Sequence, residues 1–152
     1  MKIIISLLFG LALICFAQVT FAQTTNPNEF KGAVPTLDQY NALYVLNTSD
    51  PKQVKGTLRN IANVLGDPRL KGKLHVELVA FSDGVEVFKK DGPYQETLEA
   101  LLAKGVILAQ CENTIRERKI DKSELFDFVS YVPTGNGEIV LRHYEGWAIV
   151  KP

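Results

Sequence analysis

Residues 104–116 read Lys104-Gly105-Val106-Ile107-Leu108-Ala109-Gln110-Cys111-Glu112-Asn113-Thr114-Ile115-Arg116, and this stretch decides the fold. A glycine turn precedes four apolar residues, which lead to a cysteine and to the polar start of a helix. A short apolar run of this kind is typical of a parallel strand that is covered on both faces. Cys111 would then end a strand, at the edge of an open α/β sheet where ligands and reacting groups collect.

The position of Cys111 at the start of a helix favours ionisation of its thiol. Unpaired amide groups and the positive end of the helix dipole stabilise the thiolate, which is the nucleophilic form. The carboxylate of Glu112 acts against ionisation unless Arg116 or Arg118 folds back to offset it. We therefore hypothesise a nucleophilic sulfur that opens to solvent at the mouth of a crevice. The alternative is a small buried hydrophobe, which is what a free cysteine usually is.

The N-terminus has the features of a secretory signal peptide. Met1-Lys2 is a short basic region, residues 3–16 are apolar, and small residues stand in Thr20-Phe21-Ala22. This pattern predicts a signal peptide over residues 1–22 that is cleaved before Gln23, and an exported protein that is periplasmic or secreted. The apolar run is shorter than the roughly 20 residues that span a bilayer, so we expect no stable membrane insertion after cleavage. A retained N-terminal anchor is the alternative.

Cleavage would leave 130 residues, enough for one domain with its own core. This mature chain has 16 basic and 17 acidic residues and no basic stripe, so we expect no nucleic-acid partner. It contains one cysteine, Cys111, because Cys15 lies in the signal peptide, and therefore it cannot form an internal disulfide.

Strand and helix patterns alternate along the chain after a polar segment. Residues 23–39 are rich in turn formers and predict a flexible leader, whereas residues 40–152 form the domain. Predicted strands cover residues 41–47, 74–81, 106–109, 128–132 and 147–150. Predicted helices cover residues 51–65, 94–104 and 112–120, and a last one carries Ile139, Val140 and His143. The alternation predicts an α/β fold with a parallel sheet and helices on both faces.

Two further groups of polar residues are expected at the same sheet edge as Cys111. Asn113 and Thr114 follow the cysteine and would orient its sulfur or a bound anion; ordinary helix capping is the alternative. Ser82, Asp83 and Gly84 follow the second strand and would line the crevice; a simple turn is the alternative. These residues complete the candidate site.

The sequence indicates neither a metal nor a cofactor. His75 lies early in a strand and His143 lies on the last helix, so neither is expected near Cys111, and a Cys-His hydrolase is disfavoured. Two histidines without a cysteine pair make no metal site, and Gly135-Asn136-Gly137 lacks the pattern of a dinucleotide loop. The aromatic residues Tyr144 and Trp147 are expected in the core.

Several segments, in this order, carry a resemblance to a known family: residues 100–106 (Ala-Leu-Leu-Ala-Lys-Gly-Val), 109–114 (Ala-Gln-Cys-Glu-Asn-Thr), 132–135 (Val-Pro-Thr-Gly) with 138–140 (Glu-Ile-Val), and 144–152 (Tyr-Glu-Gly-Trp-Ala-Ile-Val-Lys-Pro). Together they resemble the DsrE/DsrF-like superfamily, and the similarity runs from about Ala42 to the C-terminus. The resemblance implies a three-layer α/β/α sandwich with a five-stranded parallel sheet.

The resemblance also implies a function. The best understood members are sulfur-relay proteins, which carry a persulfide on a cysteine, pass its outer sulfur to a partner cysteine, and commonly form homo- or hetero-oligomers. By position, Cys111 is the counterpart of that cysteine, which implies a sulfur carrier with a sulfur donor or acceptor protein as partner. Many relatives have His-Gly where this chain has Phe81-Ser82. The alternative function is a non-catalytic ligand-binding or assembly module with a structural cysteine.

Overall fold

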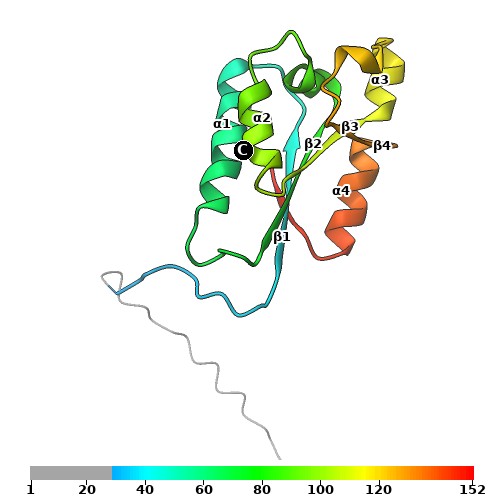
Figure 1. The fold of residues 1–152 in the computed structure, drawn as a ribbon. Helices are drawn as coiled ribbons and strands as arrows, with labels where there is room; N and C mark the ends of the chain where they lie inside the picture. The colour runs from blue at the N-terminus through cyan, green and yellow to red at the C-terminus, as the bar shows by residue number, and fades with distance from the viewer. Residues whose placement is uncertain (1–28) are drawn as a thin grey trace, which may run out of the picture. The chain divides into compact units, whose positions relative to one another are not determined.

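The structure is a computed structural model of the chain, and it describes residues 29–152 (Figure 1). The predicted signal peptide, its cleavage point and the first residues of the leader lie outside the described residues. Contacts divide the chain into a segment that ends at Ala33 and a compact unit from Val34 to Pro152. Residues 29–33 contain no helix or strand.

Five parallel strands form one sheet in the order β4-β3-β2-β1-β5. The strands are β1 (Tyr40–Leu46), β2 (Leu74–Ala80), β3 (Ile107–Cys111), β4 (Ser130–Val132) and β5 (Ala148–Val150). Their parallel pairing brings all carboxyl ends to one edge of the sheet. The predicted α/β class and the five-stranded parallel sheet are confirmed.

Helices cover the sheet on both faces. They are α1 (Pro51–Leu65), α2 (Gln95–Leu102), α3 (Glu112–Arg118) and α4 (Gly135–Tyr144), with 3-10 segments η1 (Ser82–Phe88) and η2 (Lys122–Glu124). Figure 1 shows α1 and α2 together on one face and α4 on the other, which is the expected three-layer arrangement. Within residues 29–152, no helix combines the length and the apolar character of a membrane-spanning segment.

Helix α1 shows how the sequence sets these elements. The Asp50 carboxylate accepts hydrogen bonds from the amides of Lys52 and Gln53, at 2.7 and 3.4 Å, and Pro51 occupies the first helical position. Val54 and Ile61 lie on the apolar stripe that packs on the sheet, and both are fully buried. The helix therefore begins where the capping residues predict.

The two faces of the sheet bury unequal cores. The face under α1 and α2 carries a large apolar cluster that includes Leu78, Leu98 and Leu108. The face under α4 carries a small one, in which Leu43, Val45 and Val79 are buried and Ile139 and Trp147 are partly buried. Apolar burial therefore holds α4 far less firmly than it holds α1 and α2.

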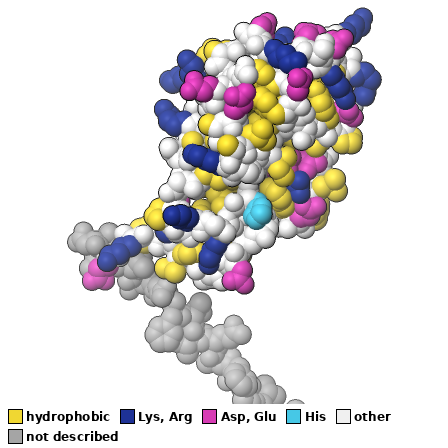
Figure 2. Space-filling model, in the orientation of Figure 1, with side chains coloured by type: hydrophobic (Ala, Val, Ile, Leu, Met, Phe, Trp, Pro, Cys, Tyr) yellow, Lys and Arg dark blue, Asp and Glu magenta, His cyan; other side chains and the backbone are white. Residues whose placement is uncertain are grey.

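The outer side of α4 is apolar and exposed. Val140, Leu141 and Tyr144 expose 53%, 62% and 87% of their surfaces, and Figure 2 shows hydrophobic side chains at the surface over this part of the molecule. The expectation that Tyr144 lies in the core is wrong, because polar side chains of α4 occupy the side that faces the sheet. The same expectation for Trp147 agrees with its packing against the small cluster.

Gly56 offers a test of the helix argument. It lies inside α1, and a methyl group built there meets no atom within 4 Å. Alanine is favoured over glycine inside helices, so we expect Gly56→Ala to raise the free energy of unfolding by about 0.5–1 kcal/mol in urea titrations. Gly84→Ala is the contrasting variant, because its Cβ would lie 2.2 Å from the Leu46 carbonyl oxygen. A loss of stability in Gly56→Ala would contradict the prediction.

Candidate functional site

Two helices begin beside Cys111, the last residue of β3. Helix α3 starts at the next residue. In β4, Val132 is the register partner of Cys111, and α4 begins three residues later at Gly135. The N-cap of α4 is Thr134, whose hydroxyl accepts a hydrogen bond of 2.8 Å from the Gly137 amide. The first turns of α3 and α4 therefore converge at the carboxyl end of β3.

A polar cavity of about 310 Å³ opens at this edge of the sheet. Its walls come from residues at or after the carboxyl ends of β1, β2, β3 and β4, from α3 and from the start of α4. The lining residues are Asn47, Phe81, Ser82, Cys111, Asn113, Thr114, Glu117, Thr134, Gly135 and Asn136. A cavity of this size accommodates a small molecule or a short protruding group, but not a folded domain.

Cys111 lines the cavity but is almost completely buried, with 4% of its surface exposed. The hypothesis of a sulfur that opens directly to solvent is therefore wrong. The reason is that two helix starts, and not one, pack against the end of β3. Access to the sulfur runs through the cavity.

The pKa of the Cys111 thiol is lowered, although burial by itself raises it. The backbone amides of Thr114, Gly135 and Asn113 and the Thr114 hydroxyl favour the charged thiolate and together outweigh the burial. These donors come from the first turns of α3 and α4, where helix amides lack partners within the helix. The arrangement favours a thiolate without a histidine or a metal.

Thr114 connects the sulfur to the loop after β2. The residue is 5% exposed, and its Oγ1 accepts a hydrogen bond of 2.9 Å from the Ser82 amide. Since the oxygen is engaged as an acceptor, the hydroxyl hydrogen remains to be donated to the Cys111 sulfur. Ser82 adopts φ of +53°, which is uncommon for a residue other than glycine, and this conformation accompanies its bond to Thr114.

Neither Asn113 nor Thr114 caps α3. The N-cap residue is Cys111 itself, with no capping hydrogen bond from its side chain. The Asn113 side-chain oxygen accepts a hydrogen bond from the Arg116 guanidinium. Both residues line the cavity, so the capping interpretation does not describe what their side chains do.

Asp83 and Gly84 do not line the cavity. The Asp83 carboxylate forms an ion pair of 2.5 Å with Arg118, which joins η1 to α3. Gly84 lies directly on the Leu46 carbonyl group, where a Cβ would collide with it. These two residues fix the loop that carries Ser82, and Ser82 is the member of the group that reaches the cavity.

The charge of Glu112 is offset by Lys122, and not by Arg116 or Arg118. Its carboxylate forms an ion pair of 2.7 Å with Lys122 in η2. Arg116 and Arg118 are engaged with Asn113 and Asp83. Among the described lining residues, Glu117 is the one whose side chain carries a charge.

Sequence reasoning missed the contribution of residues 134–136. Gly135 begins α4, and a Cβ there would lie 2.7 Å from Cδ1 of Phe81. Glycine is therefore required by the close approach of the helix start to the loop after β2. The sequence places Thr134 and Gly135 after a strand, at the same sheet edge as Cys111, but it does not show that this strand is the neighbour of β3.

Neither a metal-like cluster nor a histidine lies beside Cys111 among the described residues. Within residues 29–152, no group of three or more His, Cys, Asp or Glu side chains is arranged to hold a metal ion. His75 is exposed on β2 and His143 is exposed on α4, and neither lines the cavity. The candidate nucleophile in the cavity wall is the Cys111 thiol.

The chain matches the family model described as DsrE/DsrF-like over residues 42–152. The protein belongs to the DsrE/DsrF-like family. The matched region of this DsrE-like chain contains all of β2, β3 and β4 and both helices that surround Cys111. The recognition made from the sequence is therefore confirmed.

Solved structures similar to this DsrE-like protein share its fold. A protein of unknown function from Methanobacterium thermoautotrophicum, MTH1491, is 32% identical with a TM-score of 0.71; the match covers 75% of this chain and 100% of that one. BT1422 from Bacteroides thetaiotaomicron, also of unknown function, is 13% identical with a TM-score of 0.61; the match covers 74% of this chain and 94% of that one. The YchN protein from E. coli is 21% identical with a TM-score of 0.57; the match covers 75% of this chain and 99% of that one. The last two show the fold alone. Among curated proteins, none matches the chain significantly.

The lowered pKa of Cys111 predicts how the reactivity of its thiol depends on pH. We expect the rate of alkylation by iodoacetamide to rise with pH and to reach half of its maximum below the ordinary thiol pKa of 9.0. Thr114→Val removes one donor to the thiolate and should move this midpoint to higher pH, whereas Thr114→Ser keeps the hydroxyl and should change it little. A midpoint at or above 9.0 in the unmodified protein would contradict the assignment.

Proposed function

We propose that this DsrE-like protein carries sulfane sulfur as a persulfide on Cys111 and passes it to a partner protein. The observation that supports the proposal best is the convergence of amide donors from α3 and α4 on the one cysteine of the family domain. Membership in a family whose best understood proteins relay sulfur supports it independently. The role requires no cofactor and no metal.

The transfer is a balanced exchange of sulfur between thiolates. The Cys111 thiolate attacks the outer sulfur of a persulfide, a polysulfide or thiosulfate, and a new S–S bond forms while the donor leaves as a thiolate, a shorter polysulfide or sulfite. An acceptor thiolate then attacks the outer sulfur on Cys111 and releases the Cys111 thiolate. Donors that lower the thiol pKa also stabilise Cys111 as the leaving group in this second step.

A buried Cys111 that lines a cavity is compatible with a carrier. The cavity of about 310 Å³ has room for one added sulfur atom and for the tip of a reacting group. A bulky thiol reaches the sulfur poorly, so the persulfide is shielded from exchange with unrelated proteins. The acceptor must present its cysteine on a narrow protruding segment.

Intact-mass measurement after incubation with polysulfide tests the carrier role. We expect a gain of one sulfur atom that dithiothreitol removes. Cys15→Ser in the full chain is the matched control and should retain the gain, whereas Cys111→Ser should lose it. No gain on a protein whose Cys111 reacts with iodoacetamide would contradict the proposal.

The competing function is a binding module in which Cys111 is structural. The burial of the residue favours this alternative, because inert cysteines are usually buried. A module of this kind would leave Cys111 unmodified by polysulfide while a small ligand occupies the cavity. The mass measurement therefore distinguishes the two functions.

The carrier is proposed to act after export, in the periplasm or outside the cell, on the basis of the N-terminal sequence alone. It is also proposed to assemble, either with copies of itself or with the sulfur donor or acceptor. The exposed apolar side of α4 supports assembly, since monomers seldom leave such side chains clustered in water. We propose that a second copy of the chain packs against this apolar side of α4.

Light scattering after size-exclusion chromatography tests this assembly. We expect a mass above that of the monomer, and we expect Leu141→Glu to shift the protein toward the monomer because it places a charge in the apolar contact. Lys52→Glu on α1 is the control on the opposite face of the sheet. A monomeric protein at all concentrations would exclude self-assembly through α4.

A further inference from the structure

Helix α4 turns polar side chains toward the sheet. Glu138 and Arg142 expose only 15% and 24% of their side chains, and Ile139 is the apolar residue of α4 that packs on the sheet. The apolar residues Val140 and Leu141 lie on the exposed side. The usual pattern of a helix on a sheet is thus reversed over this segment. Polar contacts must supply much of what places α4.

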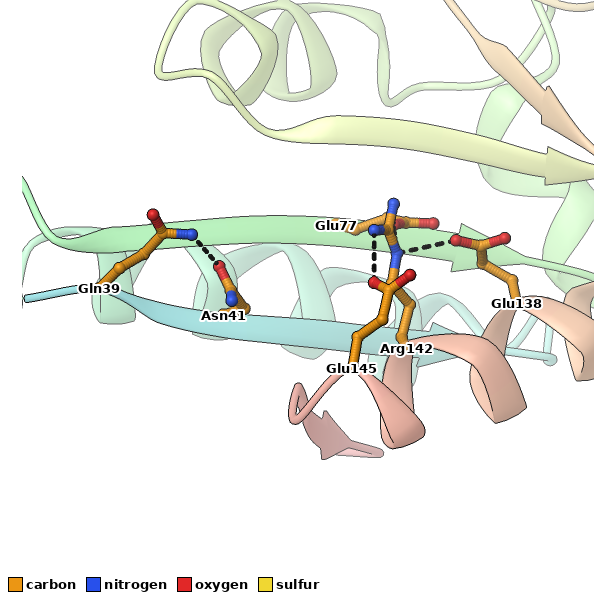
Figure 3. Close-up of polar contacts among 6 residues, drawn as sticks. All are labelled: Gln39, Asn41, Glu77, Glu138, Arg142 and Glu145. Carbon is orange, nitrogen blue, oxygen red and sulfur yellow. Dashed lines mark hydrogen bonds and ion pairs between the residues drawn. The ribbon is translucent and has the colours of Figure 1, made fainter. Parts of the chain in front are cut away.

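Arg142 makes those contacts, which Figure 3 shows. Its Nε and Nη2 reach one oxygen of Glu77, Oε2, at 2.9 and 2.8 Å. The guanidinium also contacts Glu138 at 2.8 Å and Glu145 at 3.1 Å, and it lies 4.2 Å from the centre of the Trp147 ring. The contacts with Glu77 and Trp147 tie α4 to β2 and to the segment before β5, whereas Glu138 and Glu145 hold the guanidinium in place from within the helix and its C-cap.

Glu77 is the member of this cluster that belongs to the sheet. The residue lies in the middle of β2 and is 1% exposed, and its Oε1 has no hydrogen-bond partner among the described residues. Burial raises the pKa of Glu77, and the positive charge of Arg142 opposes this change. The carboxylate thus gives α4 one buried attachment point on β2.

We propose that Arg142 is a positioning residue for Cys111, because its ion pair with Glu77 holds α4 so that Gly135, at the start of the helix, stays beside Cys111 in the wall of the cavity. This inference rests on the proposed role of Cys111 as a thiolate. It adds a residue outside the cavity to those that determine the reactivity of the site.

The connection from Arg142 to the sulfur runs along one rigid helix. Arg142 lies seven positions after Gly135, which is about 10 Å along the helix axis. At its start, α4 is held by the tight contact of Gly135 with Phe81, and in the middle by Ile139. The Arg142–Glu77 ion pair is the third attachment. When it is lost, the helix can tilt on the other two contacts, and the Gly135 amide moves away from the sulfur.

A direct electrostatic effect of Glu77 on Cys111 predicts a shift of the thiol pKa in the opposite direction when Glu77 is replaced. If Glu77 acted on Cys111 only through its charge, its removal would lower the thiol pKa, since a negative charge disfavours the thiolate. If Glu77 acts by holding Arg142, its removal raises the thiol pKa, because one donor to the sulfur is weakened. Glu77→Gln therefore separates positioning from through-space electrostatics.

The experiment measures the Cys111 pKa in the full chain from thiolate absorbance at 240 nm. The Cys111→Ser protein gives the background from Cys15 and the tyrosines. For Glu77→Gln and Arg142→Gln we expect the pKa to rise and the alkylation rate at neutral pH to fall roughly three- to tenfold. The limiting alkylation rate at high pH should stay unchanged, because the sulfur remains reachable. Glu96→Gln on α2 removes an exposed carboxylate and serves as the matched control.

Circular dichroism verifies that each variant is folded. Glu77→Gln keeps the shape of the side chain and removes a buried charge, so this variant decides the outcome even if Arg142→Gln unfolds. An unchanged or lowered thiol pKa in folded Glu77→Gln overturns the proposal. The carrier role is tested independently by sulfur uptake. If the unmodified protein takes up no sulfur while Glu77→Gln still raises the thiol pKa, Arg142 positions the site but the protein does not transfer sulfur.

Discussion

The approach of two helix starts to the Cys111 sulfur depends on β3 and β4 being neighbours in a parallel sheet. Their register pairs Cys111 with Val132, so the helices that follow the two strands begin side by side. The left-handed Ser82 and the close contact of Gly135 with Phe81 bring the loop after β2 to the same point. A different strand order would leave the sulfur with the donors of one short helix.

Burial and the neighbouring amide and hydroxyl groups shift the pKa of this thiol in opposite directions. Removal of the thiolate from water disfavours it, and the amides of α3 and α4 restore its stability. The balance differs from that of an exposed reactive cysteine, in which water solvates the anion directly. Here the protein itself supplies the solvation, so small changes in helix placement alter the chemistry.

Residues 104–116 were enough to place a cysteine at the carboxyl end of a parallel strand, since a short apolar run and a following helix start are local signals. Gly135 escaped prediction because its nearness to Cys111 depends on the strand order, which no local pattern contains. The Glu77–Arg142 pair joins residues 65 positions apart and has no periodic signature. Tyr144 was misplaced because a core position was inferred from residue type, whereas the ion pair orients α4 the other way.

Both outer strands of the sheet are short. β4 and β5 contain 3 residues each and flank longer strands in the interior. An edge of this length exposes few unpaired backbone groups, so it is a poor template for another chain to add as an extra strand. The fold thereby discourages fibril-like stacking through its backbone.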